Sequence, residues 1–409
     1  MRSVVRRITH RASRLTALVT AMVWLSGCLT AGYVIQAGLG QLRLLGQARP
    51  IAEVIADPEV DARTKALLGR VPDILAYASK RGLADQGNYR EYVELDRPSV
   101  VWFMAASRPL AFEPRVWSFP IVGSFTYVGW FDYREARTIE RILLERGWDV
   151  HIRRVHAYST GGWFHDPILS SMLSDEDDAV SALAHVLFHE LTHANVLMND
   201  QSTFNESIAS FVGDTMTEEY LIERFGDDSP VVTSYRTDLA EDNQRGARLA
   251  SAYGELDALY KGNEPVAVKL ASKRRVLDRL EFELGLPYRV NNASLINFKT
   301  YNAGMAEFTR LYQTCSKNWL RFLAAVKSLR PAAFGSEQTD DIGPVITALT
   351  SKGCPDTVPK GAMLQPGARG FTANLRPGIV GSSGSPHRPS QVAFPDCRAR
   401  RDGVVLLSR

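Results

Sequence analysis

Hydrophobic residues recur at helical spacing in two early segments, residues 33–47 and about 59–82. Gly82 would end the second of these helices. Between residues 98 and 131 the pattern changes to short runs of β-branched and aromatic residues divided by proline and glycine. Such runs are typical of strands, so we predict several short strands in this part of the chain.

The rest of the pattern is mainly helical. Residues 132–147 predict an amphipathic helix that ends at Gly147, and residues 149–158 alternate between apolar and polar positions as a strand does. From about 177 to 330 the spacing is helical almost throughout. Helices, a few strands and then many helices predict an α+β fold, with a small mixed or antiparallel sheet packed on a mainly helical body.

The first 27 residues look like a targeting segment. Residues 1–14 contain five arginines, and residues 15–24 form an apolar run too short to span a bilayer, which needs about 20 residues. This order predicts a secretory signal peptide. The sequence LSGC at 25–28 follows directly and resembles a bacterial lipobox, in which Cys28 is acylated and becomes the first mature residue. The alternative is a plain signal peptide with an incidental cysteine.

Lipidation at Cys28 would anchor the protein to a membrane. Because Leu29 rather than aspartate follows it, the resemblance to enteric-type lipoproteins favours the periplasmic face of the outer membrane. Residues 356–409 hold seven glycines and six prolines without sustained apolar spacing, which predicts a disordered tail. A single folded domain is therefore expected over residues 28–355.

Composition narrows the class of protein. The 409 residues are 45% hydrophobic and 23% charged, which excludes collagen-like, disordered and multi-span membrane proteins. The net charge is +3, but residues 28–355 alone carry −7, which argues against nucleic acid as a partner. Cys315 and Cys354 could form a bridge and leave Cys397 over, but the sequence does not decide the pairing.

The sequence HELTH at residues 189–193 carries the most specific chemistry. On a helix, His189 and His193 share one face, so both imidazoles can reach one ion, and neutral imidazole suits Zn²⁺. Glu190 lies beside the first ligand, where it can accept a proton from metal-bound water as the general base. The alternative is a helix with two hydrogen-bonded core histidines.

A third ligand is expected thirteen residues further on. Residues 199–202 predict a turn and residues 204–222 resume helical spacing, so an antiparallel helix pair would bring Glu206 beside His193. One zinc ion with two histidines, one glutamate and an open position for water follows. Ser210, one turn later, could hold an outer contact.

His185 shares the face of the other two histidines, but it lies about 12 Å from His193 along the helix axis. One ion cannot take all three from a straight helix. We therefore expect His185 to be packed or hydrogen-bonded outside the ligand set.

The wider pattern resembles the bacterial zinc lipoproteins described as predicted aminopeptidases, in the glutamate-liganded (gluzincin or thermolysin-like) clan of zinc peptidases. The resemblance runs from residue 28 to about 330 and leaves the tail outside. Besides the HELTH helix, several segments carry it: residues 32–41, 48–51, 129–132, 158–167, 204–213 and 291–301.

This resemblance implies a zincin-like fold and a cell-envelope peptidase that acts on peptide substrates. In gluzincins the strand before the metal helix pairs with an extended substrate, here residues 149–160. Gly161 and Gly162 would then let the substrate backbone approach. A tyrosine or histidine usually stabilises the oxyanion, and Tyr301 and Tyr158 are the candidates. The aminopeptidase specificity follows from the family name alone.

Two other functions remain open from the sequence. One is a lipoprotein that binds peptides or assists assembly and keeps its zinc for structure. The other is a zinc hydrolase that cleaves amide bonds of the cell wall. The intact Glu190 favours the two enzymes over the binding protein.

Overall fold

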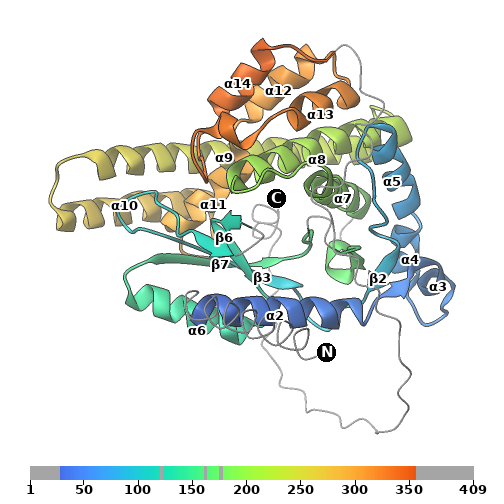
Figure 1. Cartoon of the computed structure of the whole chain (residues 1–409), viewed down its shortest axis with the longest axis horizontal. Coiled ribbons are helices and arrows are strands. Elements are labelled where there is room, and N and C mark those ends of the chain that lie inside the picture. The colour runs from blue at the N-terminus through green and yellow to red at the C-terminus, as the bar shows by residue number, and fades with distance from the viewer. Residues whose placement is uncertain (1–27, 120–122, 161–163, 175–177, 356–409) are drawn as a thin grey trace, which may run out of the picture.

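The computed structural model of the chain describes four segments, residues 28–119, 123–160, 164–174 and 178–355 (Figure 1). They form an α+β arrangement, as the sequence predicts. The predicted signal peptide, Gly161 and Gly162, and the predicted disordered tail lie outside the described residues. No helix among the described residues is long and apolar enough to cross a bilayer.

The central sheet has three antiparallel strands in the order β6–β3–β7. Strand β3 (Val101–Ser107) lies between β6 (Tyr127–Trp130) and β7 (Asp149–Val155). All three were expected from the β-branched and aromatic runs and the alternating segment. Because side chains alternate along a strand, the two faces of this sheet carry different residues.

One face of the sheet packs against α2 (Cys28–Leu45) and α6 (Tyr133–Glu145). Met104 and Val128 on this face share a hydrophobic cluster with Tyr33 of α2, which begins five residues earlier than predicted. The opposite face packs against α11 (Asn292–Asn302). In Figure 1, α2 and α6 therefore lie on one side of the sheet, and α8 and α11 on the other.

Helix α2 is fixed to the outer strand β6. The Gln36 side chain accepts a hydrogen bond from the backbone nitrogen of Phe131 (3.0 Å) and donates one to the oxygen of Gly129 (3.3 Å). Gly40 allows this approach, because a Cβ there would lie 2.2 Å from the Phe131 ring. The helix therefore cannot turn about its axis without breaking these contacts.

Two smaller sheets complete the β structure of the described residues. Strands β1 (Arg49–Pro50), β2 (Glu91–Val93) and β8 (Ile168–Leu169) form a mixed sheet, and β4 (Trp117–Phe119) pairs with β5 (Gly123–Phe125). The first three strands were not predicted. Runs of two or three residues are too short for an alternation to be seen.

The helical region also follows the sequence prediction. Helices α7 (Ala179–Asn195) and α8 (Ser202–Phe225) pack against each other with their contacts in antiparallel order, from His193 beside Glu206 to His185 beside Asp214. Helices α9 (Pro230–Lys261) and α10 (Val266–Leu284) form a hairpin that projects from the body in Figure 1. The sequence pattern did not distinguish this projection from the core.

The single helix predicted over residues 59–82 is wrong, because two helices stand there. They are α4 (Ala62–Leu68) and α5 (Val71–Lys80), which follow the short α3 (Ile51–Ala56). Helix α4 ends at Gly69, and a proline in the first turn of α5 begins a new helix.

Three helices pack over α8 at the C-terminal end of the described chain, α12 (Met305–Thr314), α13 (Trp319–Lys327) and α14 (Gly343–Ser351). A disulfide joins Cys315, just after α12, to Cys354, just after α14. The bridge that the sequence left open is therefore present, and it closes this helical cap.

Candidate metal centre

Helix α7 carries His189 and His193 four residues apart, so both side chains leave the same face. The neighbouring helix α8 comes close because of Gly213, where a Cβ would lie 2.9 Å from Nε2 of His185. His185 pairs instead with Oδ1 of Asp214 at 3.1 Å. It therefore ties α7 to α8 and stays out of the ligand set, as its distance along the helix requires.

Asn205 closes the turn between the two helices. Its side chain donates to the oxygen of Met198 and accepts from the nitrogen of the same residue, both at 2.8 Å. This holds the first turn of α8 against the end of α7, where Glu206 faces the histidines. Asp200, in the same turn, accepts a hydrogen bond from the backbone nitrogen of Ser124 in β5 (2.6 Å).

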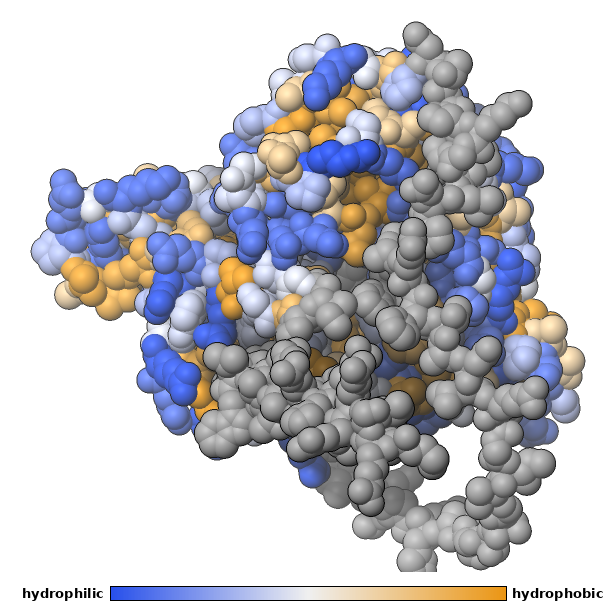
Figure 2. Space-filling model, viewed as in Figure 1, coloured by the Kyte–Doolittle hydropathy of each residue, from blue (hydrophilic) through white to orange (hydrophobic). Residues whose placement is uncertain are grey.

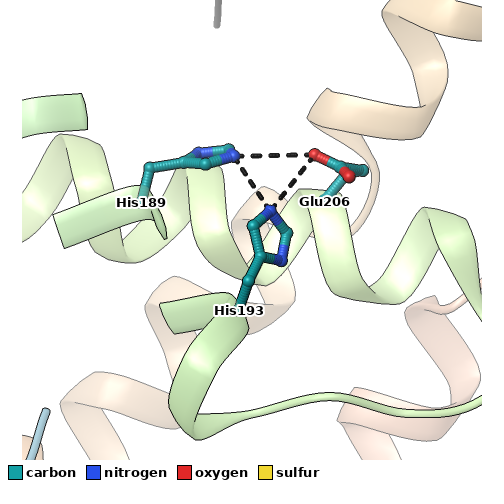
Figure 3. Close-up of side chains that lie close together, drawn as sticks. All are labelled: His189, His193 and Glu206. Carbon is teal, nitrogen blue, oxygen red and sulfur yellow. Dashed lines mark hydrogen bonds and ion pairs between the residues drawn. The ribbon is translucent and has the colours of Figure 1, made fainter. Parts of the chain in front are cut away.

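Three side chains converge here, His189, His193 and Glu206 (Figure 3). The two Nε2 atoms are 3.2 Å apart. Oε2 of Glu206 lies 3.5 Å from His189 Nε2 and 3.6 Å from His193 Nε2. The structure therefore brings together the three residues that the sequence nominates as metal ligands.

This donor set fits a zinc ion. Atoms bound at about 2.0–2.1 Å to a tetrahedral ion lie about 3.3 Å from one another, close to the three separations above. Two imidazole nitrogens and one carboxylate are a ligand set of catalytic zinc sites with an open position. Nδ1 of His189 departs from the usual pattern, because it is buried and makes no hydrogen bond with any described residue.

Glu190 lies beside this cluster and is buried. Burial raises its pKa to about 8, against the opposing effect of His193. Its Oε2 makes no hydrogen bond with the described residues. A buried carboxylate oxygen without a protein partner, next to a possible metal site, fits a group that exchanges a proton with water.

Burial and the neighbouring charges together set the protonation of the three ligand candidates. Burial lowers the pKa of His189 to about 4. Burial also lowers the pKa of His193, but the carboxylates of Glu206 and Glu190 outweigh it and bring the value to about 9. Burial raises the pKa of Glu206, yet the two histidines outweigh it and hold the pKa well below its usual range. Metal binding would therefore displace a proton from His193.

Two tyrosines flank Glu206. The hydroxyl of Tyr127, on β6, donates to Oε1 at 2.5 Å, which leaves Oε2 to the histidines. Tyr301, on α11, stacks on His189 with ring centroids 6.2 Å apart and planes at 16°. Burial, and then the charge of Glu206, raise the pKa of Tyr301 above its usual range, so its hydroxyl keeps its proton.

Helix α11 is held in place by Ser207, the residue after the glutamate. Its Oγ donates to the oxygen of Thr300 (2.9 Å) and accepts from the nitrogen of Ala303 (3.1 Å). These two bonds bracket Tyr301. The position of the tyrosine is thus set by the same turn of α8 that positions Glu206.

The sheet contributes Arg153 of β7. Its guanidinium lies 4.5 Å from the centroid of the Phe103 ring, and its Nη2 donates to the hydroxyl of Tyr301 at 3.1 Å. The side chain is 8% exposed, and no carboxylate of the described residues forms an ion pair with it. A buried cation without an acid partner is costly and therefore unusual.

Two further candidates from the sequence are not joined to the cluster. The hydroxyl of Tyr158 donates to Gln41 of α2, and its ring contacts Phe131. Ser210 is buried, but its hydroxyl makes no hydrogen bond with the described residues. Of the two tyrosines considered for the oxyanion, only Tyr301 lies beside the three converging side chains.

Sequence reasoning missed Tyr127 and Arg153. Each stands in a predicted strand, and the alternation of side chains places each on the face of the sheet that packs against α11. The signal was therefore the alternation itself, but only the pairing of β3 with both neighbours brings the two residues to the same place.

A family model described as "Putative aminopeptidase" matches residues 32–339, which are 308 of the 409 residues. The chain belongs to this family. Membership suggests peptidase activity, and the matched region includes the three ligand candidates, Glu190 and Tyr301. Neither the curated proteins nor the solved structures contain a match to the chain.

Proposed function

We propose that this member of the family is a zinc-dependent peptidase of the cell envelope. The observation that carries the proposal is the convergence of His189, His193 and Glu206 within 3.2–3.6 Å of one another, beside the buried Glu190. The family description supports peptide bonds as the substrate. The pairing of the HELTH helix with the helix of Glu206 supports a gluzincin-like assignment.

A bound Zn²⁺ would polarise the peptide carbonyl and lower the pKa of a water molecule. Glu190 is placed to accept the proton of that water during attack and to pass it to the leaving amine. Tyr301 offers its proton to the carbonyl oxygen as that atom gains charge. Strand β7 is an outer strand of its sheet, which supports pairing with an extended peptide.

The proposed location follows from the N-terminus. Cys28 is the acyl acceptor of the lipobox and also the first residue of α2. The anchor would hold the protein on the periplasmic face of the outer membrane. Growth with a labelled fatty acid tests this step, because Cys28→Ala should abolish incorporation of the label.

The decisive experiment measures zinc content and hydrolysis on the same preparation. Wild-type protein should hold about one zinc and cleave peptides with a free amino end, and a chelator should stop cleavage. Glu190→Gln should keep the zinc and lose about 10²–10⁴-fold in rate, because only the proton acceptor is removed.

Other substrates separate the remaining functions. Cleavage of cell-wall fragments but not of peptides would favour the cell-wall hydrolase. Zinc binding without cleavage of either substrate would favour the peptide-binding or assembly protein. Turnover by Glu190→Gln at the wild-type rate would remove Glu190 from the mechanism.

A further inference from the structure

Helix α2 exposes a row of large aliphatic side chains, Val34 (52% exposed), Ile35 (62%), Leu39 (49%) and Leu42 (62%). At about 100° per residue, these four fall within an arc of about 140° on one side of the helix. The opposite side carries Tyr33, Gln36 and Gly40, which contact the sheet and Phe131. These four side chains, which we call the α2 row, therefore face away from the rest of the protein.

The α2 row also lacks the charges that usually accompany exposed apolar residues. Arg43 is the single charged residue among the 18 of α2. Figure 2 shows a second apolar area at the end of the α9–α10 hairpin, where Val266 is 64% exposed. Helix α10 differs because charged residues stand throughout it. A contiguous row on an almost uncharged helix indicates a contact surface.

The start of the helix identifies the partner as a lipid bilayer. The proposed acyl group on Cys28 would hold the first turn of α2 at the membrane surface. Val34 follows six residues later, about 9 Å along the axis, and Leu42 lies about 21 Å from the anchor. Helix α2 is not apolar enough to cross a bilayer, but a helix with one apolar side can lie in the interface.

We propose that the α2 row lies on the membrane and gives the protein a fixed orientation. The proposal rests on the lipidation of Cys28, but not on the peptidase chemistry. One acyl chain binds weakly, so apolar contact beside the anchor strengthens attachment. Gln36 fixes α2 to β6, so the sheet would separate the bilayer from the metal cluster (Figure 1). Peptides would reach the cluster from the aqueous side.

Fluorescent labels test the orientation in the lipidated, full mature chain. Ile35→Cys, Leu42→Cys and, as a control of equal exposure, Val266→Cys each receive an environment-sensitive dye in a Cys397→Ser background. The proteins are reconstituted in vesicles of phosphatidylethanolamine and phosphatidylglycerol that contain a lipid-borne quencher. Labels at 35 and 42 should be blue-shifted and quenched, and the label at 266 should not. Equal quenching at all three positions, or at none, overturns the proposal.

A second measurement does not depend on the anchor. In the mature chain with Cys28→Ser, Ile35→Asp together with Leu42→Asp should lower co-sedimentation with the same vesicles at least about tenfold, because buried aliphatic contacts are lost. Val266→Asp should leave it unchanged. Equal binding by all variants overturns the proposal. The proposal is also overturned if the chain self-associates in solution without vesicles and Ile35→Asp abolishes this association.

Separate measurements show whether the proposed function fails independently of the membrane orientation. The mass of the membrane-extracted protein reports acylation at Cys28, and zinc content and peptide cleavage report the metal chemistry. Neither of the latter should change in the Ile35→Asp and Leu42→Asp variant. An unacylated chain would remove the anchor, and vesicle binding would still decide the role of the α2 row.

Discussion

Arg153 donates a hydrogen bond from Nη2 to the hydroxyl oxygen of Tyr301, 3.1 Å away. Arginine has no acceptor, so the tyrosine must accept this bond and donate its own proton elsewhere, and the Glu206 carboxylate lies within hydrogen-bond reach of it. The raised pKa of Tyr301, caused first by burial, keeps that proton in place. The pair therefore presents a fixed donor beside His189 and Glu206.

The first prediction concerns this donor. Tyr301→Phe should lower kcat by about 10²–10³-fold and leave zinc content unchanged, which is the usual cost of one oxyanion donor. Arg153→Met should lower kcat by less. In the Tyr301→Phe background it should have little further effect, because Arg153 acts through the tyrosine. Steady-state kinetics of both single variants and the double variant measure this coupling.

The denaturant midpoint distinguishes a positioning role of Arg153 from a purely structural one. Arg153 is a buried cation without a carboxylate partner among the described residues, so Arg153→Met should not lower the denaturant midpoint. Arg153→Lys keeps the charge but not the planar fork, and it should retain part of kcat. A lower midpoint with unchanged kcat would make Arg153 a structural residue only.

The second prediction concerns zinc affinity. Tyr127 holds Oε1 of Glu206, so Tyr127→Phe should weaken zinc binding about 10–100-fold, the usual effect of losing a contact to a metal ligand. At saturating zinc, kcat should recover. Tyr33→Phe is a matched control, because that hydroxyl accepts a bond from Gly129 of the same strand and belongs to the opposite face of the sheet. Competition with a chromogenic chelator measures the affinities, and equal affinities would remove Tyr127 from the site.

The convergence of His189, His193 and Glu206 could be predicted from sequence because it depends on local geometry. His189 and His193 are one turn apart on a single helix, and Glu206 follows after one short turn. The return of the second helix needs only a turn signal and resumed helical spacing. A contact of this kind is fixed by neighbouring residues in the chain.

The contacts around these three side chains could not be predicted in the same way. Arg153 lies opposite Phe103 in one strand pairing, and Tyr127 lies opposite Ala105 in the other. Sequence alternation gives the face of each residue but not the register, and a shift of one residue would reverse the face. Tyr158 is the opposite case. It lies near α7 in the sequence, but its hydroxyl donates to Gln41 of α2 and does not lie beside the three converging side chains.

The third prediction concerns acid stability. His151 is buried on β7, and burial lowers its pKa to about 3 from 6.5. Below pH 6.5 the imidazole of His151 binds a proton in the unfolded chain but stays neutral in the folded chain. The stability contributed by neutral His151 is therefore complete above pH 6.5 and falls as the pH drops toward 3, by about 1.4 kcal/mol per pH unit.

Replacing His151 should make the free energy of unfolding depend less steeply on pH in acidic solution. Denaturant unfolding of His151→Leu between pH 7 and 4 should lose about 3 kcal/mol less than the wild type over the same range. The exposed His165 supplies the control, and His165→Gln should follow the wild-type curve. Parallel curves for His151→Leu and the wild type would show that His151 is not buried as a neutral group.

The fourth prediction assigns the third zinc ligand. Glu206→Ala should reduce bound zinc from about one per chain to near zero after dialysis, because two imidazoles alone hold the ion weakly. Asp214→Ala should keep its zinc, since that carboxylate pairs with His185 about 12 Å further along α8. Metal analysis of both variants tests the assignment. Stoichiometric zinc with unchanged affinity in Glu206→Ala would exclude the two-histidine, one-glutamate site and reduce the case for peptidase chemistry to the HELTH sequence and the family membership.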